Sequence, residues 1–202
     1  MMPPTDELFP VLNQLREWLD NDVSQLLRHS RTPAPYGAAL CIIVGCEALS
    51  RLLKEDPPHG IFARELIQYH RKSFTLAMGK DIFQALRNGL AHIYDTELLR
   101  IGLGGPEVGL IVSWKDYSHL ELVRKGQWLG LVLHVPTMWE DLQRVMNSAL
   151  GKTKKGDGQL ISKNWKDSRV WEASDLTLAG WARELGVAPG QPIGKRSQCR
   201  RP

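Results

Sequence analysis

Residues 87–94 read Arg-Asn-Gly-Leu-Ala-His-Ile-Tyr, and this stretch decides how the chain is interpreted. An arginine can neutralise charge that builds on a phosphate, and a histidine that titrates near neutrality can move a proton to or from a ribose hydroxyl. On a helix each residue turns by about 100°, so Arg87 and His92 point roughly 140° apart, whereas Asn88 and His92 share a face. Arg87 and His92 can therefore address one phosphate only through the reach of the arginine or through a second copy of the helix.

The stretch resembles the R-x4-H-x-Y motif of the HEPN superfamily, whose members are small all-helical domains. Arg87, His92 and Tyr94 stand at the motif positions, and Asn88 matches the polar residue that often follows the arginine. The resemblance covers mainly residues 6–100. It implies a homodimer whose two motifs face each other across a cleft that cleaves single-stranded RNA without a metal or other cofactor. Arg87, Asn88, His92 and Tyr94 are then the expected catalytic residues.

The same resemblance implies a biological setting. Many HEPN domains are toxins or phage-defence nucleases, often encoded beside an antitoxin. In one branch a nucleotidyltransferase partner modifies the motif tyrosine with AMP, and Tyr94 is the residue that would receive it. An antitoxin or a nucleotidyltransferase is therefore an expected partner.

The expected reaction is attack of the ribose 2′-hydroxyl on the phosphate, which leaves a 2′,3′-cyclic phosphate end. Two other classes of function stay open. The first is a non-catalytic HEPN-like module that binds nucleotide, RNA or protein through the same cleft. The second is a helical interaction protein in which Arg87 and His92 only satisfy buried polar groups such as Glu47.

Glu47 stands in an otherwise apolar stretch, beside Cys46. A carboxylate there is costly unless it is paired. We expect Arg87 or His92 to be its partner, which would make Glu47 a residue that orients the motif from behind. An exposed Glu47, or one paired with Arg51 one helical turn away, is an equally acceptable alternative.

Apolar residues recur at helical spacing in five segments, and residues 38–44 are apolar almost all round, which suggests the central helix of a bundle. Gly79 interrupts the pattern before the motif, while Thr137 and Glu140 form a capping box at the start of the last segment. Helices are therefore expected over residues 8–27, 36–54, 61–73, 81–99 and 137–150.

The period changes after Ile101, where glycines and a proline break the helix. Residues 108–114, 119–125 and 128–135 are typical of short strands joined by tight turns. The expected fold class is therefore mainly α, an up-and-down HEPN-like bundle with an inserted short antiparallel β meander near residues 107–135.

The net charge of +4 is unevenly distributed. Residues 151–202 carry 11 Lys and Arg against 5 Asp and Glu, whereas the rest of the chain carries 15 against 17. We expect one helical domain over residues 1–153 and a basic extension over residues 154–202. The extension should contain one short helix, from about Asp175 to Leu185, and a disordered tail that could also attract a phosphate backbone.

The composition excludes several classes of protein. No run approaches 18 apolar residues and the N-terminus lacks a signal-peptide pattern, so a secreted or membrane-spanning protein is not expected. The odd set of Cys41, Cys46 and Cys199 has no zinc spacing and suits a reducing compartment. A cytoplasmic location is therefore expected.

Overall fold

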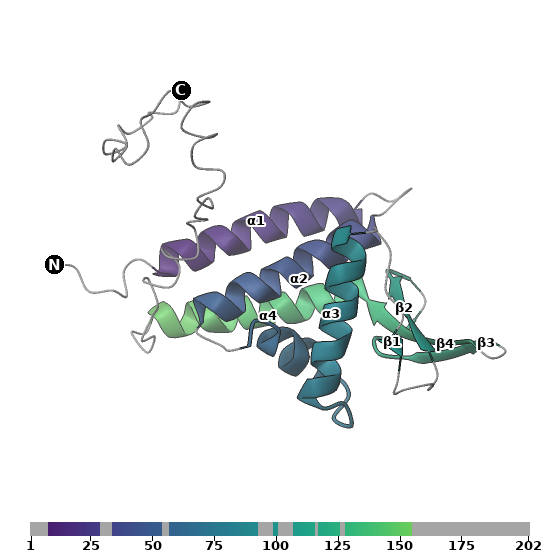
Figure 1. Cartoon of the computed structure of the whole chain (residues 1–202). Helices are drawn as coiled ribbons and strands as arrows, with labels where there is room; N and C mark the ends of the chain where they lie inside the picture. The colour runs from purple at the N-terminus through teal and green to yellow at the C-terminus, as the bar shows by residue number, and fades with distance from the viewer. Residues whose placement is uncertain are drawn as a thin grey trace, which may run out of the picture. The chain divides into compact units, whose positions relative to one another are not determined.

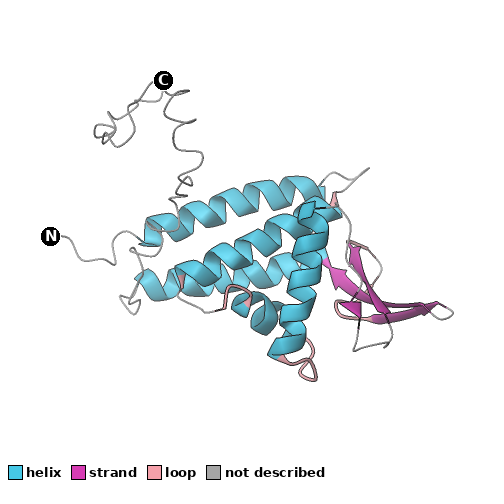
Figure 2. Cartoon of the chain, in the orientation of Figure 1, coloured by secondary structure: helices cyan, strands magenta, loops and turns pink. Residues whose placement is uncertain are grey.

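A computed structural model of the chain describes residues 8–28, 34–53, 57–92, 99–100, 107–115, 117–125 and 128–154. This part is mainly helical with one small mixed sheet, so the expected helical class is confirmed (Figures 1 and 2). The helices are α1 (Leu8–Arg28), α2 (Pro35–Leu52), the π-type helix η2 (Phe62–Gln68), α3 (Leu76–His92) and α4 (Val135–Lys154). The strands are β1 (Leu99–Arg100), β2 (Glu107–Ser113), β3 (Leu122–Lys125) and β4 (Trp128–His134).

Helix α2 lies at the centre of the core, as its apolar sequence predicts. It contacts α1, α3 and α4, and Figure 1 shows α1, α2 and α4 side by side with α3 running across them. Gly45 lets the neighbours approach, since a Cβ there would lie 2.7 Å from Cδ1 of Leu19 and 3.1 Å from Cδ2 of Leu142. In the described ranges α2 is also the one helix long and apolar enough to cross a membrane, and half of its length is buried in the protein.

Helix α3 begins earlier than expected, at Leu76 rather than Asp81. Gly79 lies inside this helix instead of breaking it. A Cβ at Gly79 would lie 2.6 Å from the Cβ and 2.7 Å from the Cα of Ala63. The glycine therefore serves close packing between α3 and η2, which a local reading of helix propensity cannot detect.

The end of the motif helix also differs from the prediction. The described helix ends at His92, and Leu99 belongs to strand β1, so the helix does not extend to Leu99. The third predicted helix is shorter than residues 61–73 as well. Its described form is η2, where Tyr69 N–H donates to Arg64 O at 3.0 Å, a five-residue spacing that is frequent near functional sites.

The expected antiparallel meander near residues 107–135 is wrong. The strand order is β1-β2-β4-β3, with β2 and β4 parallel and the β3–β4 pair antiparallel. The physical reason is burial. Leu131, Val132 and Leu133 are all buried, which is typical of a central strand covered on both faces, while β3 exposes Leu122 and Arg124 at the edge. The β3–β4 hairpin itself was predicted correctly.

The loop before β3 joins the sheet to η2. Leu120 has a left-handed backbone, with φ of 61°, and its N–H donates to Val132 O at 2.8 Å. Arg71, just after η2, donates through Nη1 to the Leu120 carbonyl at 2.8 Å. A non-glycine residue keeps such a backbone only where its surroundings hold it firmly, so this loop is a fixed connection between sheet and helices.

Helix α4 closes the core through the apolar face that its sequence predicts, including buried Leu142 and Met146. It begins at Val135, so Thr137 does not cap it through the expected capping box; its Oγ1 instead lies 2.9 Å from Nδ1 of His134. Every described residue belongs to the compact unit Met1–Trp165. The predicted basic extension, apart from Lys154, and its short helix lie outside the described residues.

Candidate functional site

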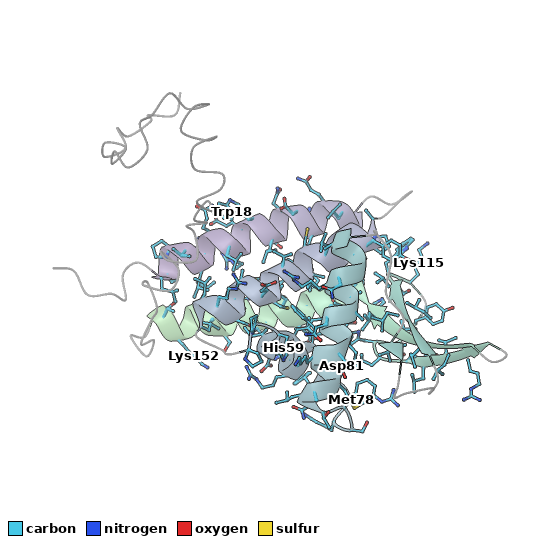
Figure 3. The ribbon with its side chains drawn as sticks, in the orientation of Figure 1. Trp18, His59, Met78, Asp81, Lys115 and Lys152 are labelled. Atoms are coloured by element: carbon cyan, nitrogen blue, oxygen red, sulfur yellow. The ribbon has the colours of Figure 1, made fainter. Side chains whose placement is uncertain are left out.

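The motif arginine meets Glu47 where α3 passes α2. Arg87 Nε donates to Oε2 of Glu47 at 3.1 Å. The Arg87 side chain is 45% exposed and that of Glu47 is 16% exposed. Met78 and Asp81, labelled in Figure 3, mark the other end of α3. The expected contact between Glu47 and Arg87 is therefore present.

The alternative partner of Glu47 is present too. Arg51, one turn along α2, donates through Nη2 to Oε1 of Glu47 at 2.6 Å. Each carboxylate oxygen thus holds one arginine. Two guanidinium groups share a single negative charge, so these three side chains together carry a net positive charge.

The Glu47 contact leaves the phosphate-binding end of Arg87 available. Only Nε contacts the carboxylate, and within the described ranges no partner is recorded for the terminal Nη atoms. These two nitrogens form the planar fork that binds phosphate oxygens in a bidentate manner. Glu47 therefore orients the guanidinium group without occupying that fork.

The other motif residues are described less fully. Asn88 follows Arg87 on α3 and is half-buried, and Gly89 is buried. His92 is the last described residue of α3, and its side chain is outside the description. Tyr94 lies outside the described residues. The structure therefore brings Arg87 and Glu47 together and does not test the arrangement of His92 and Tyr94.

A second polar group escaped the sequence analysis. His70, just after η2, has Nε2 at 2.5 Å from Oδ2 of Asp141 on α4. The other oxygen, Oδ1, accepts from Arg144 Nη2 at 3.1 Å. The Asp141 side chain is only 8% exposed, whereas that of His70 is 28% exposed. The buried Asp141 therefore holds Nε2 of His70, while the His70 ring is partly exposed at the surface.

His119 lies beside His70, with ring centroids 5.2 Å apart, but it has a different chemistry. Its Nδ1 accepts from His134 N–H at 3.1 Å, so its Nε2 carries the proton and donates to Leu66 O at 2.9 Å. Burial lowers the pKa of His119 to about 4. With both nitrogens in use, His119 stays neutral and anchors the loop, whereas Nδ1 of His70 has no recorded partner in the described ranges.

The sequence held one signal for this second group. Asp141 falls on the apolar face of α4, beside Met138, Leu142 and Val145. A carboxylate on such a face needs a hydrogen-bond partner, just as Glu47 does on α2. The distant partner, His70, cannot be read from spacing because it comes from another element.

No protein-family model matches the chain. The comparisons with curated proteins and with solved structures also give no significant match. Among the described residues, no group of three or more His, Cys, Asp or Glu side chains is placed to hold a metal ion.

Proposed function

We propose that this chain is a metal-independent endoribonuclease that cleaves single-stranded RNA as a cytoplasmic homodimer of HEPN-like helical bundles. One observation carries the proposal. The motif arginine is oriented by Glu47 through Nε and remains 45% exposed, so its terminal nitrogens are available to a phosphate. Arg51 adds a second positive charge beside it.

In the proposed reaction the ribose 2′-oxygen attacks the phosphorus and the bond from phosphorus to the 5′-oxygen breaks. The products are a 2′,3′-cyclic phosphate and a 5′-hydroxyl. His92 takes the 2′-hydroxyl proton or protonates the leaving oxygen, and Arg87 stabilises the added negative charge of the phosphorane. Asn88 holds the phosphate or orients His92, and Tyr94 supports the cleft.

The helix geometry favours a dimer. Because positions five residues apart on a helix are separated by roughly 140°, a facing copy can supply the second group to the same phosphate. Two histidines, one from each protomer, can then divide the acid and base roles. The setting we propose is toxin–antitoxin or phage defence, with an antitoxin or a nucleotidyltransferase that acts on Tyr94 as partner.

The test is cleavage of labelled single-stranded RNA in EDTA. We expect the full chain to cut RNA and leave cyclic phosphate ends, and we expect Arg87→Ala and His92→Ala to lower the rate by at least about 100-fold. Arg124→Ala is the matched control, because it removes an equally charged, exposed arginine from the edge strand β3. Circular dichroism and sedimentation establish that all variants keep fold and oligomeric state.

The proposal is overturned if the full chain dimerises and leaves RNA intact, or if Arg87→Ala cuts as fast as Arg124→Ala. A helical interaction protein is the second candidate, and one observation favours it. The shared contact of Glu47 with Arg51 and Arg87 also satisfies a carboxylate in the core helix. In that case Arg87→Ala lowers the free energy of unfolding, and neither the variant nor the original chain cleaves RNA.

A further inference from the structure

Tyr69 is an aromatic side chain left at the surface. It follows η2 and is 51% exposed. Cationic groups from two elements lie against its ring. The Cζ atom of Arg144, on α4, is 4.3 Å from the ring centroid, and Nζ of Lys72 is 5.5 Å from it. We call Tyr69, His70, Lys72 and Arg144 the Tyr69 surface.

The guanidinium group of Arg144 is held firmly against this ring. Its Nη1 donates to Oε2 of Glu65 at 3.3 Å, and its Nη2 donates to Oδ1 of Asp141 at 3.1 Å. Both terminal nitrogens are therefore occupied by carboxylates, yet the side chain is still 42% exposed. An acidic ligand cannot bind the hydrogen-bonding edge of this guanidinium, because two carboxylates already occupy it. A flat ring can still stack on the face of the guanidinium.

His70 adds a polar group next to the stacked pair. Its ring packs edge-on against Tyr69, with centroids 5.2 Å apart. Asp141 holds Nε2, and within the described ranges Nδ1 has no recorded partner. Because Nε2 donates to the carboxylate, Nδ1 is the acceptor nitrogen and can accept from a ribose hydroxyl or a base N–H. Lys72, which is exposed, supplies a mobile positive charge for a phosphate.

We propose that the Tyr69 surface binds a nucleotide, either free or as a unit of single-stranded RNA. The base stacks on Tyr69 and Arg144, the phosphate binds Lys72, and a ribose hydroxyl donates to Nδ1 of His70. A nucleotide is favoured over an acidic peptide because the surface offers an exposed aromatic ring and the face of a guanidinium whose hydrogen-bonding edge is already filled. None of these groups belongs to the Arg87 site, so the inference stands apart from the proposed cleavage.

The test is binding to the full chain carrying Arg87→Ala, which removes the motif arginine and blocks the proposed cleavage. Calorimetry with 5′-AMP and with single-stranded oligoadenylate of about ten nucleotides gives the two affinities. We expect Tyr69→Ala to weaken binding at least about fivefold and Tyr69→Phe to keep it, because the ring does the stacking. Tyr117→Ala removes a comparable tyrosine, 45% exposed, and should have no effect.

Lys72→Ala should lower the salt dependence of oligoadenylate binding by about 0.7 in the logarithmic slope. Binding of both probes indicates a mononucleotide site, and binding of the oligonucleotide alone indicates an RNA site; either result supports the inference. It is overturned if neither probe binds, or if Tyr69→Ala and Tyr117→Ala bind equally well. If the unmodified chain, with Arg87 present, does not cleave RNA, that result counts against the proposed function and not against this inference.

Discussion

Two carboxylates in this chain each accept hydrogen bonds from two side chains that come from different parts of the fold. Glu47 holds Arg51 from its own helix and Arg87 from α3. Asp141 does the same on α4, with Arg144 from its own helix and His70 from beyond η2. In both cases the two oxygens have separate partners. Each carboxylate therefore links two elements through charge-assisted hydrogen bonds where apolar packing alone would leave it unsatisfied.

At the scale of single residues, His119 gives a testable prediction. Burial keeps the pKa of its folded form near 4, below the usual 6.5, so the unfolded chain binds more protons between these values. Stability should therefore fall as the pH falls through this window, by about 2–3 kcal/mol from this residue. Urea unfolding from about pH 7.5 to about pH 4.5 measures it.

His119→Gln is the control for this effect. Its amide can still donate to Leu66 O, but it does not titrate. The variant should start from a lower stability at neutral pH and lose less on acidification. Parallel curves for the two proteins would show that His119 is not the source of the pH dependence.

The partner of Glu47 could be predicted from the sequence, because a carboxylate on an apolar helix needs a cation nearby. Both candidate arginines are bound to Glu47. Sequence reasoning missed Asp141, although the apolar face of α4 carried the same signal. The pairing with His70 joins residues 71 positions apart, and no local spacing specifies such a contact.

At the scale of elements, helix existence was easier to predict than helix ends or strand order. The apolar periodicity of α1, α2 and α4 is a local property, and these helices were expected within a few residues of their bounds. The loop through Leu120 leads into β3, and its left-handed backbone is bonded to Arg71, just after η2, and to Val132 on β4. A run of alternating residues contains no such information.

Gly79→Ala tests the packing between the elements α3 and η2. In Gly79→Ala the new methyl would clash with Ala63, including its backbone, so we expect the free energy of unfolding to fall by about 1–3 kcal/mol despite the better helix propensity of alanine. Gly151→Ala is the matched control on α4, because nothing lies within 4 Å of its new Cβ. That variant should gain up to about 1 kcal/mol. Urea unfolding that gives the same sign for both would contradict the packing argument.

At the scale of the whole described unit, the first and last helices complete one core. α4 packs on both α1 and α2, and Gln143 Nε2 donates to Oδ1 of Asp20 at 3.1 Å. The core residues Leu19, Gly45 and Leu142 meet where these three helices touch. The stability of α1, α2 and α4 therefore depends on contacts between residues that are far apart in the sequence.

Leu142→Ala tests this dependence. Leu142 is fully buried at the junction, so the substitution should cost about 2–5 kcal/mol and should leave a single cooperative transition. Leu122→Ala removes the same atoms from a side chain that is 46% exposed on β3, and it should cost less than about 1 kcal/mol. Equal losses in thermal or urea unfolding would place the centre of the core elsewhere.

The central place of α2 has a consequence for synthesis. The ribosome makes Pro35–Leu52 early and Val135–Lys154 about 80 residues later, a delay of several seconds at roughly 5–20 residues per second. During that interval one side of α2 lacks the helix that covers it, and α2 has the length and composition of a membrane-crossing segment. The nascent chain therefore passes through a stage at which chaperones and membrane-targeting factors can compete for this helix, and the arrival of α4 ends that competition.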